Sequence, residues 1–219
     1  MVIGHYAVAM GAKRWAPAAS LGTLIAAGAF LDLVWPVLVL LGIEVVTITP
    51  GATALSPLTF VYYPYSHSLL MSVIWGVLFG SLYFIARRYA PGAIAVGLLV
   101  VSHWILDAIV HVPDLPLTLD DGVKVGLGLW NSLPLSLAVE VGVFVAGVWI
   151  YAATTKHRDS IGLWGFAGMI AFMLLIYAGA TFGPPPPDAS TVAWSDMGQW
   201  LIVALAAWVD RHRTLRQAR

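Results

Sequence analysis

Residues 92–112 read GAIAVGLLVVSHWILDAIVHV and are almost entirely apolar. A run of about 20 such residues is long enough for a helix to cross a bilayer. The run contains His103, Asp107 and His111, spaced four apart, and this spacing places the three side chains on one face of a helix. A charged side chain in the hydrocarbon costs roughly 2.5–3.5 kcal/mol, so such groups usually serve function. The segment therefore predicts a spanning helix that carries a polar site.

The whole chain has the composition of a membrane protein. Of its 219 residues, 60% are hydrophobic and 10% are charged, whereas soluble domains contain about 25% charged residues. The absence of cysteine excludes disulfides and thiolate metal sites. The net charge is zero and no strongly basic patch is present, which argues against nucleic acid as a partner.

We expect a single all-α integral membrane domain over residues 1–219, a polytopic bundle of about six transmembrane helices separated by proline and glycine breakers. The predicted helices cover residues 17–41, 67–86, 92–112, 132–153, 161–182 and 192–209. Residues 2–11 are apolar but too short to span, so they lie at the interface or re-enter the bilayer.

Basic residues predict the orientation, because cytoplasmic loops carry an excess of lysine and arginine. With six spans, ten of the eleven basic residues fall on one side: Lys13, Arg14, Arg87, Arg88, Lys156, Arg158, Arg211, Arg213, Arg216 and Arg219. Only Lys124 falls on the other side. Both termini are then cytoplasmic, and the loops at 42–66, 113–131 and 183–191 face outward with Glu44, Asp114, Asp120, Asp121 and Asp188.

Ionisable groups from four predicted helices share the outer half of the bilayer in this topology. They are Asp32, His67, His103, Asp107, His111 and Glu140. Nitrogen and oxygen ligands of this kind suit zinc, manganese or iron. The alternative is a hydrogen-bonded His–Asp pair that holds helices together. Glu140 is a ligand, a general base or the partner of a histidine, and Ser66 is expected to cap a helix.

The order of several short motifs resembles a bacterial family of inner-membrane metal-dependent hydrolases, whose founding member is described as LexA-regulated. The matching residues are Gly4-His5, Leu31-Asp32, Ser66-His67-Ser68-Leu69 and Ser102-His103 with Asp107. That family is in turn distantly similar to zinc-dependent phospholipase C and P1-type nucleases, which hold a zinc cluster with His, Asp, His, HxxxD and HxxxE segments. Here Ser136 to Glu140 has the HxxxE spacing with serine in the histidine position.

The resemblance implies a multi-pass protein of the bacterial inner membrane with one or two divalent metals, zinc above all. Asp32, His67, His103, Asp107 and His5 would be the ligands, and Glu140 or His111 the catalytic base. His5 belongs to this set only if residues 2–11 re-enter the bilayer.

The leading functional hypothesis is a membrane-embedded metal-dependent hydrolase that acts on a phosphoester of a membrane lipid or another amphiphile. A proton- or metal-ion-coupled transporter is the first alternative. Against it, the helices at 161–182 and 192–209 contribute almost no buried charge, and neither inverted repeats nor broken helices are visible. The second alternative is a structural membrane protein whose polar groups only fix helix packing.

Overall fold

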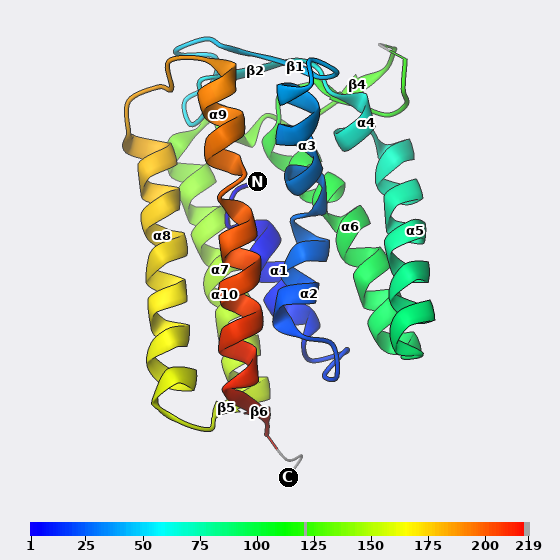
Figure 1. Cartoon of the computed structure of the whole chain (residues 1–219). Helices are drawn as coiled ribbons and strands as arrows, with labels where there is room; N and C mark the ends of the chain where they lie inside the picture. Colours follow the sequence, from blue (N-terminus) through cyan, green and yellow to red (C-terminus); the bar gives the residue numbers. More distant parts are fainter. Residues whose placement is uncertain (121, 217–219) are drawn as a thin grey trace.

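The computed structural model describes residues 1–120 and 122–216, so Asp121 and Arg219 lie outside the described residues. Long helices run side by side in one bundle, and short strand pairs close its two ends (Figure 1). The prediction of an all-α helical bundle is confirmed.

Five helical segments of the described chain are long and apolar enough to cross a membrane, and a bent helix pair raises the number to six. The five are α5 (Leu69–Arg87), α6 (Ala90–Val110), α7 (Leu133–Thr154), the π-turn Ile161–Gly165 with α8 (Phe166–Phe182), and α9 (Ala189–Asp196) with α10 (Gln199–Arg211). α6 and α7 each carry a proline in the first turn, where the missing N–H costs nothing.

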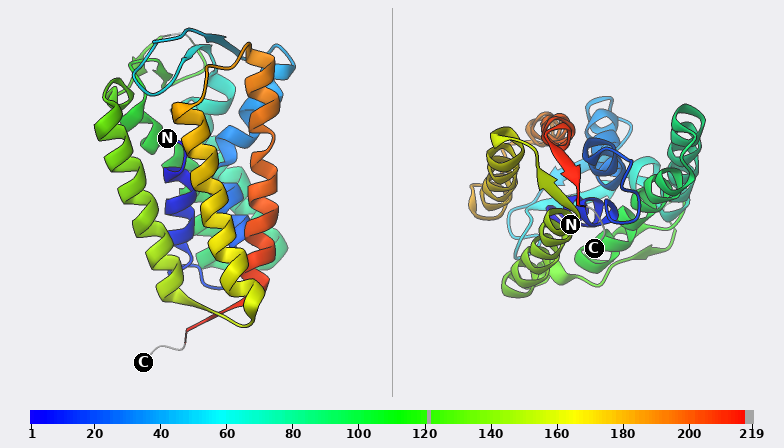
Figure 2. Two further views of the ribbon diagram at one scale, coloured as in Figure 1. Left: turned by 90° about the vertical axis from the view of Figure 1, so that its left-hand side faces the viewer. Right: turned by 90° about the horizontal axis from the view of Figure 1, so that it is seen from below.

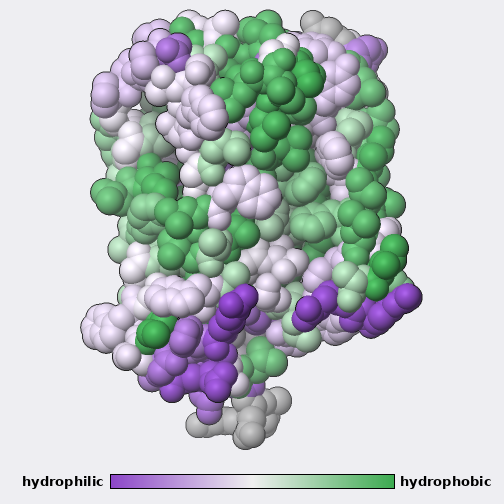
Figure 3. Space-filling model, viewed as in Figure 1, coloured by the Kyte–Doolittle hydropathy of each residue, from purple (hydrophilic) through white to green (hydrophobic). Residues whose placement is uncertain are grey.

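The outer surface of these helices is apolar, as lipid contact requires. Leu175 on α8 is 71% exposed and Val77 on α5 is 66% exposed. In Figure 3 hydrophobic residues cover much of the body of the bundle, and hydrophilic residues gather at its lower end. In water such a surface would promote aggregation, so the chain is a multi-pass membrane protein.

The first predicted span, 17–41, is a broken helix, so the expectation that broken helices are absent is wrong. The chain forms α2 (Leu21–Gly28) and α3 (Phe30–Leu40), and their axes differ by 57°. Ser20 caps α2 by accepting a hydrogen bond from the Thr23 amide at 3.1 Å. The break falls at Ala29, whose φ of −98° and ψ of 10° leave the helical region, directly after a glycine that favours helix poorly.

Residues 2–11 re-enter the bundle instead of lying at the interface. α1 (Gly4–Ala12) lies among α2, α6 and α7, and the chain starts within the bundle (Figures 1 and 2). Two glycines permit this approach. A Cβ atom at Gly28 would lie 2.9 Å from the His5 carbonyl oxygen, and one at Gly147 would lie 2.6 Å from the Ala7 Cα atom.

Short elements close the two ends of the bundle. At one end β1 (Val45–Ile48) pairs with β2 (Leu58–Tyr62), β3 (Leu115–Pro116) pairs with β4 (Lys124–Val125), and α4 (Pro64–His67) and the 3-10 turn Leu129–Asn131 lie nearby. At the other end β5 (Thr155–His157) pairs with β6 (Arg213–Leu215), directly below α10 in Figure 1.

The end of the bundle that carries β5 and β6 is called the basic end below, because arginine and lysine residues gather there. It also holds a buried ion pair that no motif in the sequence indicates. The Lys13 ammonium group is buried and donates to Asp210 Oδ2 at 2.7 Å and to the Ala19 carbonyl at 2.8 Å. Asp210 also accepts hydrogen bonds from the Tyr151 hydroxyl at 2.7 Å and the Leu21 amide at 3.0 Å. The expectation that the helix at 192–209 adds almost no charge to the interior is therefore incomplete, since Asp210 follows it directly.

The predicted orientation has a direct test, because the chain lacks cysteine. We expect a cysteine at Asp120 to react with a membrane-impermeant maleimide added outside right-side-out vesicles. A cysteine at Arg158, at the opposite end of the bundle, should react only after the vesicles are opened. The reverse pattern would overturn the orientation.

The close contact of α1 with α7 predicts a contrast between two glycines of α7. Gly147→Ala pushes a methyl group into the α1 backbone, so it should lower stability by about 1–3 kcal/mol. Gly142→Ala meets nothing within 4 Å and should be neutral or stabilising by up to about 1 kcal/mol. Thermal unfolding in detergent, followed by tryptophan fluorescence, measures both. Equal effects would show that α1 is not packed as described.

Candidate metal centre

Five ionisable side chains from four helices converge in the interior of the bundle. His5 comes from α1, Asp32 from the first turn of α3, His67 from the end of α4, and His103 and Asp107 from successive turns of α6. Four of them are buried, and Asp32 is partly exposed. The distances that link them are His103 Nε2–Asp107 Oδ2 3.1 Å, His103 Nε2–Asp32 Oδ1 3.5 Å, His67 Nε2–Asp32 Oδ1 3.3 Å, His67 Nε2–Asp107 Oδ2 3.8 Å and His5 Nε2–Asp107 Oδ1 3.1 Å.

A backbone hydrogen bond fixes the orientation of His103. Its Nδ1 atom lies 2.8 Å from the carbonyl oxygen of Gly28, at the end of α2. A carbonyl oxygen only accepts, so Nδ1 carries a proton, and Nε2 is the nitrogen through which a neutral ring would bind a metal. This Nε2 atom points towards the two carboxylates and has no hydrogen-bond partner in the described part of the chain.

A second hydrogen-bonded chain orients His67. The Ser66 hydroxyl donates to Glu44 Oε2 at 2.6 Å and lies 2.7 Å from His67 Nδ1. With its own proton given to Glu44, the hydroxyl oxygen accepts from Nδ1–H, and His67 Nε2 lies 3.3 Å from Asp32 Oδ1, within hydrogen-bond distance. Ser66 is therefore not a helix cap as expected. The cap of α5 is Ser68, which accepts from the Met71 amide at 3.1 Å.

Glu44 is part of the hydrogen-bonded chain that orients His67. The sequence predicts only that it lies in an outward-facing loop. It is only 2% exposed, and it accepts from both the amide and the hydroxyl of Ser66. Burial raises the pKa of the Glu44 carboxyl, and the two hydrogen bonds from Ser66 oppose that rise. No motif marks Glu44 in the sequence, because its partner lies 22 residues further along the chain.

His5 reaches the cluster because α1 re-enters the bundle. Its ring stacks on the ring of His103, with centroids 3.5 Å apart and planes 4° from parallel. Its Nε2 atom lies 3.1 Å from Asp107 Oδ1, and the amino group of Met1 contacts the same oxygen. Asp107 Oδ2 is left facing His103 and His67.

The cluster has the donor set and spacing of a metal site. Two groups have ligand atoms within 4.8 Å of one another, His5–His103–Asp107 and Asp32–His67–His103, and they share His103. Lone pairs of imidazole and carboxylate that face one another repel, and a cation between them would remove that repulsion. The buried His5, His103 and Asp107 can hold a metal ion, and histidine nitrogen with carboxylate oxygen suits a divalent transition metal.

Glu140 lies beside the cluster but belongs to neither group. Its Oε2 atom accepts hydrogen bonds from the Val2 amide at 2.9 Å and the Ile3 amide at 3.0 Å. These N–H groups precede α1, where the helix leaves donors without an intrahelical partner. Glu140 therefore holds the start of α1 in place and acts on the cluster through the position of His5.

The expectation that His111 continues the helical face of His103 and Asp107 is wrong. α6 ends at Val110, and His111 adopts an extended backbone with φ −63° and ψ 148°. Its Nδ1 atom lies 3.0 Å from Asp114 Oδ1, and its ring packs 4.4 Å from that of Trp130. His111 is thus separate from the two groups that could hold a metal ion.

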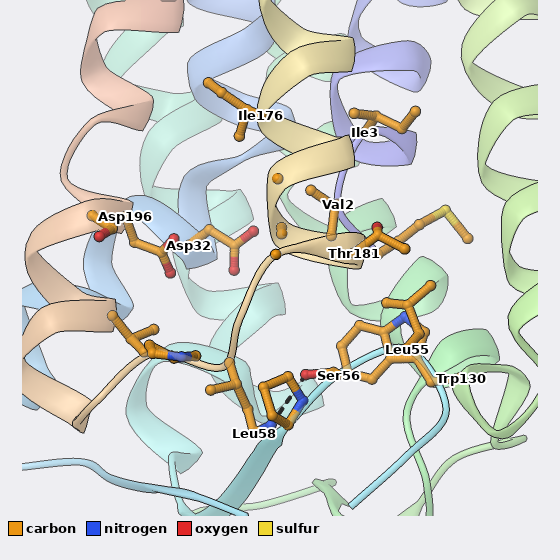
Figure 4. A pocket seen from close by; sticks show the side chains of 18 of the residues that line it. Val2, Ile3, Asp32, Leu55, Ser56, Leu58, Trp130, Ile176, Thr181 and Asp196 are labelled. Carbon is orange, nitrogen blue, oxygen red and sulfur yellow. Dashed lines mark hydrogen bonds between the residues drawn. The ribbon is translucent and has the colours of Figure 1, made fainter. Parts of the chain in front are cut away.

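A cavity of about 830 Å³ adjoins the cluster. Asp32, His67 and Asp107 of the cluster line it, and so do His111 and Trp130. Figure 4 shows Asp32 and Asp196 on neighbouring parts of the wall. Asp196 is the last residue of α9, and no feature of the sequence indicates that it faces this space. The volume lies within the range of about 300–1,000 Å³ that is typical of small-molecule sites.

Comparison of the chain with models of protein families, with curated proteins and with solved structures gave no match. The function is therefore argued from the geometry of the site.

The arrangement predicts that Asp107 is essential for metal binding. Asp107→Asn keeps the shape but removes the charge that offsets a divalent cation, so affinity should fall by more than about 100-fold. Asp114→Asn is the matched control, because Asp114 contacts His111 outside the cluster. Equilibrium dialysis with zinc and manganese, read by mass spectrometry, measures both. Equal affinity of the two variants would remove Asp107 from the ligand set.

Proposed function

We propose that the protein is a membrane-embedded metal-dependent hydrolase that acts on a phosphoester of a lipid or another amphiphile. The observation that carries this proposal is the convergence of the Nε2 atoms of His67 and His103 with two carboxylates beside a cavity. A buried cluster of this composition inside a membrane domain marks a functional site by default.

The proposed ligands are His5, Asp32, His67, His103 and Asp107. A divalent ion held there supplies Lewis-acid chemistry, which activates water and polarises a phosphoryl oxygen. The protein's own part is to fix the ligand atoms. Gly28 and Ser66 set the ring positions of His103 and His67, and Glu140 sets the start of α1.

His111 is better placed than Glu140 to exchange a proton with a substrate. It lines the cavity, and its Nδ1 atom bonds to Asp114, which leaves Nε2 as the free nitrogen. Glu140 does not line the cavity, and one of its oxygens is held by two backbone amides. We therefore assign the general acid–base role to His111 and a positioning role to Glu140.

The transporter alternative needs a polar path from the cluster to the basic end. Between the cluster and the Lys13–Asp210 pair, the interior holds fully buried apolar side chains of Met10, Leu24 and Ile25. An ion or proton would find no ligand among them, so the geometry favours chemistry at the cluster over conduction through the bundle.

Measuring turnover and metal binding in the same variants separates the acid–base role of His111 from the ligand role of Asp107. We expect zinc- or manganese-loaded protein in detergent–lipid micelles to release phosphate or headgroup from a panel of phosphoester lipids. His111→Asn should keep the metal and lose about 10²- to 10⁴-fold in kcat, because proton transfer is impaired. His157→Ala, in an exposed strand at the basic end, should change neither property.

Metal-loaded wild-type protein that hydrolyses the panel no faster than Asp107→Asn would contradict the hydrolase proposal. Metal-dependent ion flux in proteoliposomes would then support the transporter alternative. A folded Asp107→Asn variant with unchanged metal content would support the purely structural alternative.

A further inference from the structure

The cavity extends from the cluster to the space between α8 and the α9–α10 segment. On one wall it is lined by Met173, Ile176 and Gly179 of α8, and on the other by Val192, Asp196 and Leu201. Figure 4 shows Ile176 on α8 and Asp196 on α9, with Val2 and Ile3 of the re-entrant segment nearby. The cavity therefore runs from the bundle interior to a helix–helix boundary.

The two helical segments are in contact at the basic end and are apart where the cavity lies. Near the basic end a Cβ atom at Gly165 would lie 3.3 Å from Trp208 and 3.5 Å from Val209. Near the other end of α8, a Cβ atom at Gly179 would meet nothing within 4 Å, although Gly179 lines the cavity. The helices thus form a wedge that is closed at one end by packing and open over the cavity.

The open side of this wedge faces the hydrocarbon of the membrane. Ile176 is 40% exposed and Leu201 is 53% exposed, and both also line the cavity. Both belong to segments that are apolar enough to span the bilayer, Ile161–Phe182 and Ala189–Arg211. Lipid tails are the medium on this side, so a molecule that enters here comes from the bilayer.

The inner end of the same cavity is polar. Asp32, His67 and Asp107 line it beside the apolar side chains of Val2 and Ile3. A single space thus joins an apolar lateral mouth to a cluster of histidines and carboxylates. This polarity matches an amphiphile whose tail lies in the wedge and whose head lies at the cluster.

We propose that the cavity binds one hydrocarbon chain of a membrane lipid, which enters sideways between α8 and α9–α10. That the bound lipid is the substrate rests on the proposed function, whereas chain binding itself does not. On that basis the substrate class is a lipid phosphoester drawn from within the bilayer, with its headgroup directed towards Asp32 and Asp107.

Photolabelling tests chain binding without any turnover. The protein is reconstituted in phosphatidylcholine vesicles that contain a small fraction of lipid with a diazirine on one acyl chain, close to the headgroup. After illumination, labelled residues are located by mass spectrometry. The reporter is Val2, which is only half-buried although the chain starts within the bundle, because it lines the cavity. Lipids around the outside of the bundle do not reach it.

The blocking variant is Gly179→Trp, which fills the wedge. Its matched control is Gly168→Trp on the same helix, because a Cβ atom there also meets nothing within 4 Å but Gly168 does not line the cavity. The two glycines are 11 residues apart, so the control places the same side chain about three helical turns away from the cavity. Gly179→Leu is used if the tryptophan variant fails to fold, as judged by thermal unfolding.

We expect labelled Val2 in the wild type, a loss of at least about five-fold in Gly179→Trp, and unchanged labelling in Gly168→Trp. Labels confined to outward residues of the helices would overturn the proposal. Equal loss in both variants would overturn it too, and so would labelling of Val2 by a water-soluble diazirine alone, which would show an aqueous cavity. If Val2 is labelled but metal-loaded protein hydrolyses no lipid phosphoester, chain binding stands and the proposed enzymatic function fails.

Discussion

The hydrogen bond from His103 Nδ1 to the carbonyl of Gly28 links the fold of this protein to its site. The last carbonyls of a helix lack an intrahelical donor, and Gly28 ends α2 at the break before α3. The bond settles which nitrogen of His103 carries the proton and turns the other towards Asp32 and Asp107. The same glycine has no side chain, so α1 can approach and stack His5 on that ring. Without the break, these contacts would not form together.

Support of this kind recurs around the cluster. Ser66 and Glu44 hold His67 from one side, and Glu140 holds the start of α1 from another. Each supporting group bonds to an atom that faces away from the converging lone pairs. Groups behind a metal ligand commonly set its orientation and basicity in this way. The purely structural alternative accounts for the hydrogen bonds between these histidines and carboxylates, and metal binding is the property that separates the two readings.

Hydropathy and breakers were enough to predict the membrane bundle, because spanning helices of the length of α5, α6 and α7 leave a strong local signal. Counting turns from the helix ends placed Asp32, His67, His103 and Asp107 at one depth, and the structure brings these four together. The depth of a side chain in the bilayer does not predict which helices are neighbours in the bundle, because that arrangement depends on how the helices pack.

The features that the sequence did not predict are set by tertiary contacts. The entry of α1 depends on the absence of side chains at Gly28 and Gly147, which come from two other helices. His111 lies at a helix spacing from Asp107, but α6 ends before it, where its ring packs on Trp130 and its Nδ1 bonds to Asp114. Glu44 lies in a segment whose sequence is typical of a loop. It is buried in the structure, where its carboxylate accepts a hydrogen bond from the Ser66 amide.

The central claim is that these side chains bind a metal as a set. X-ray absorption spectroscopy of wild-type protein, purified without chelators and reconstituted in lipid, tests it most directly. The account predicts about one or two divalent ions per chain, with only nitrogen and oxygen in the first shell at about 2.0–2.2 Å and scattering from at least two imidazole rings. Protein that binds no ion under these conditions, or an ion surrounded by water without imidazole scattering, would contradict it.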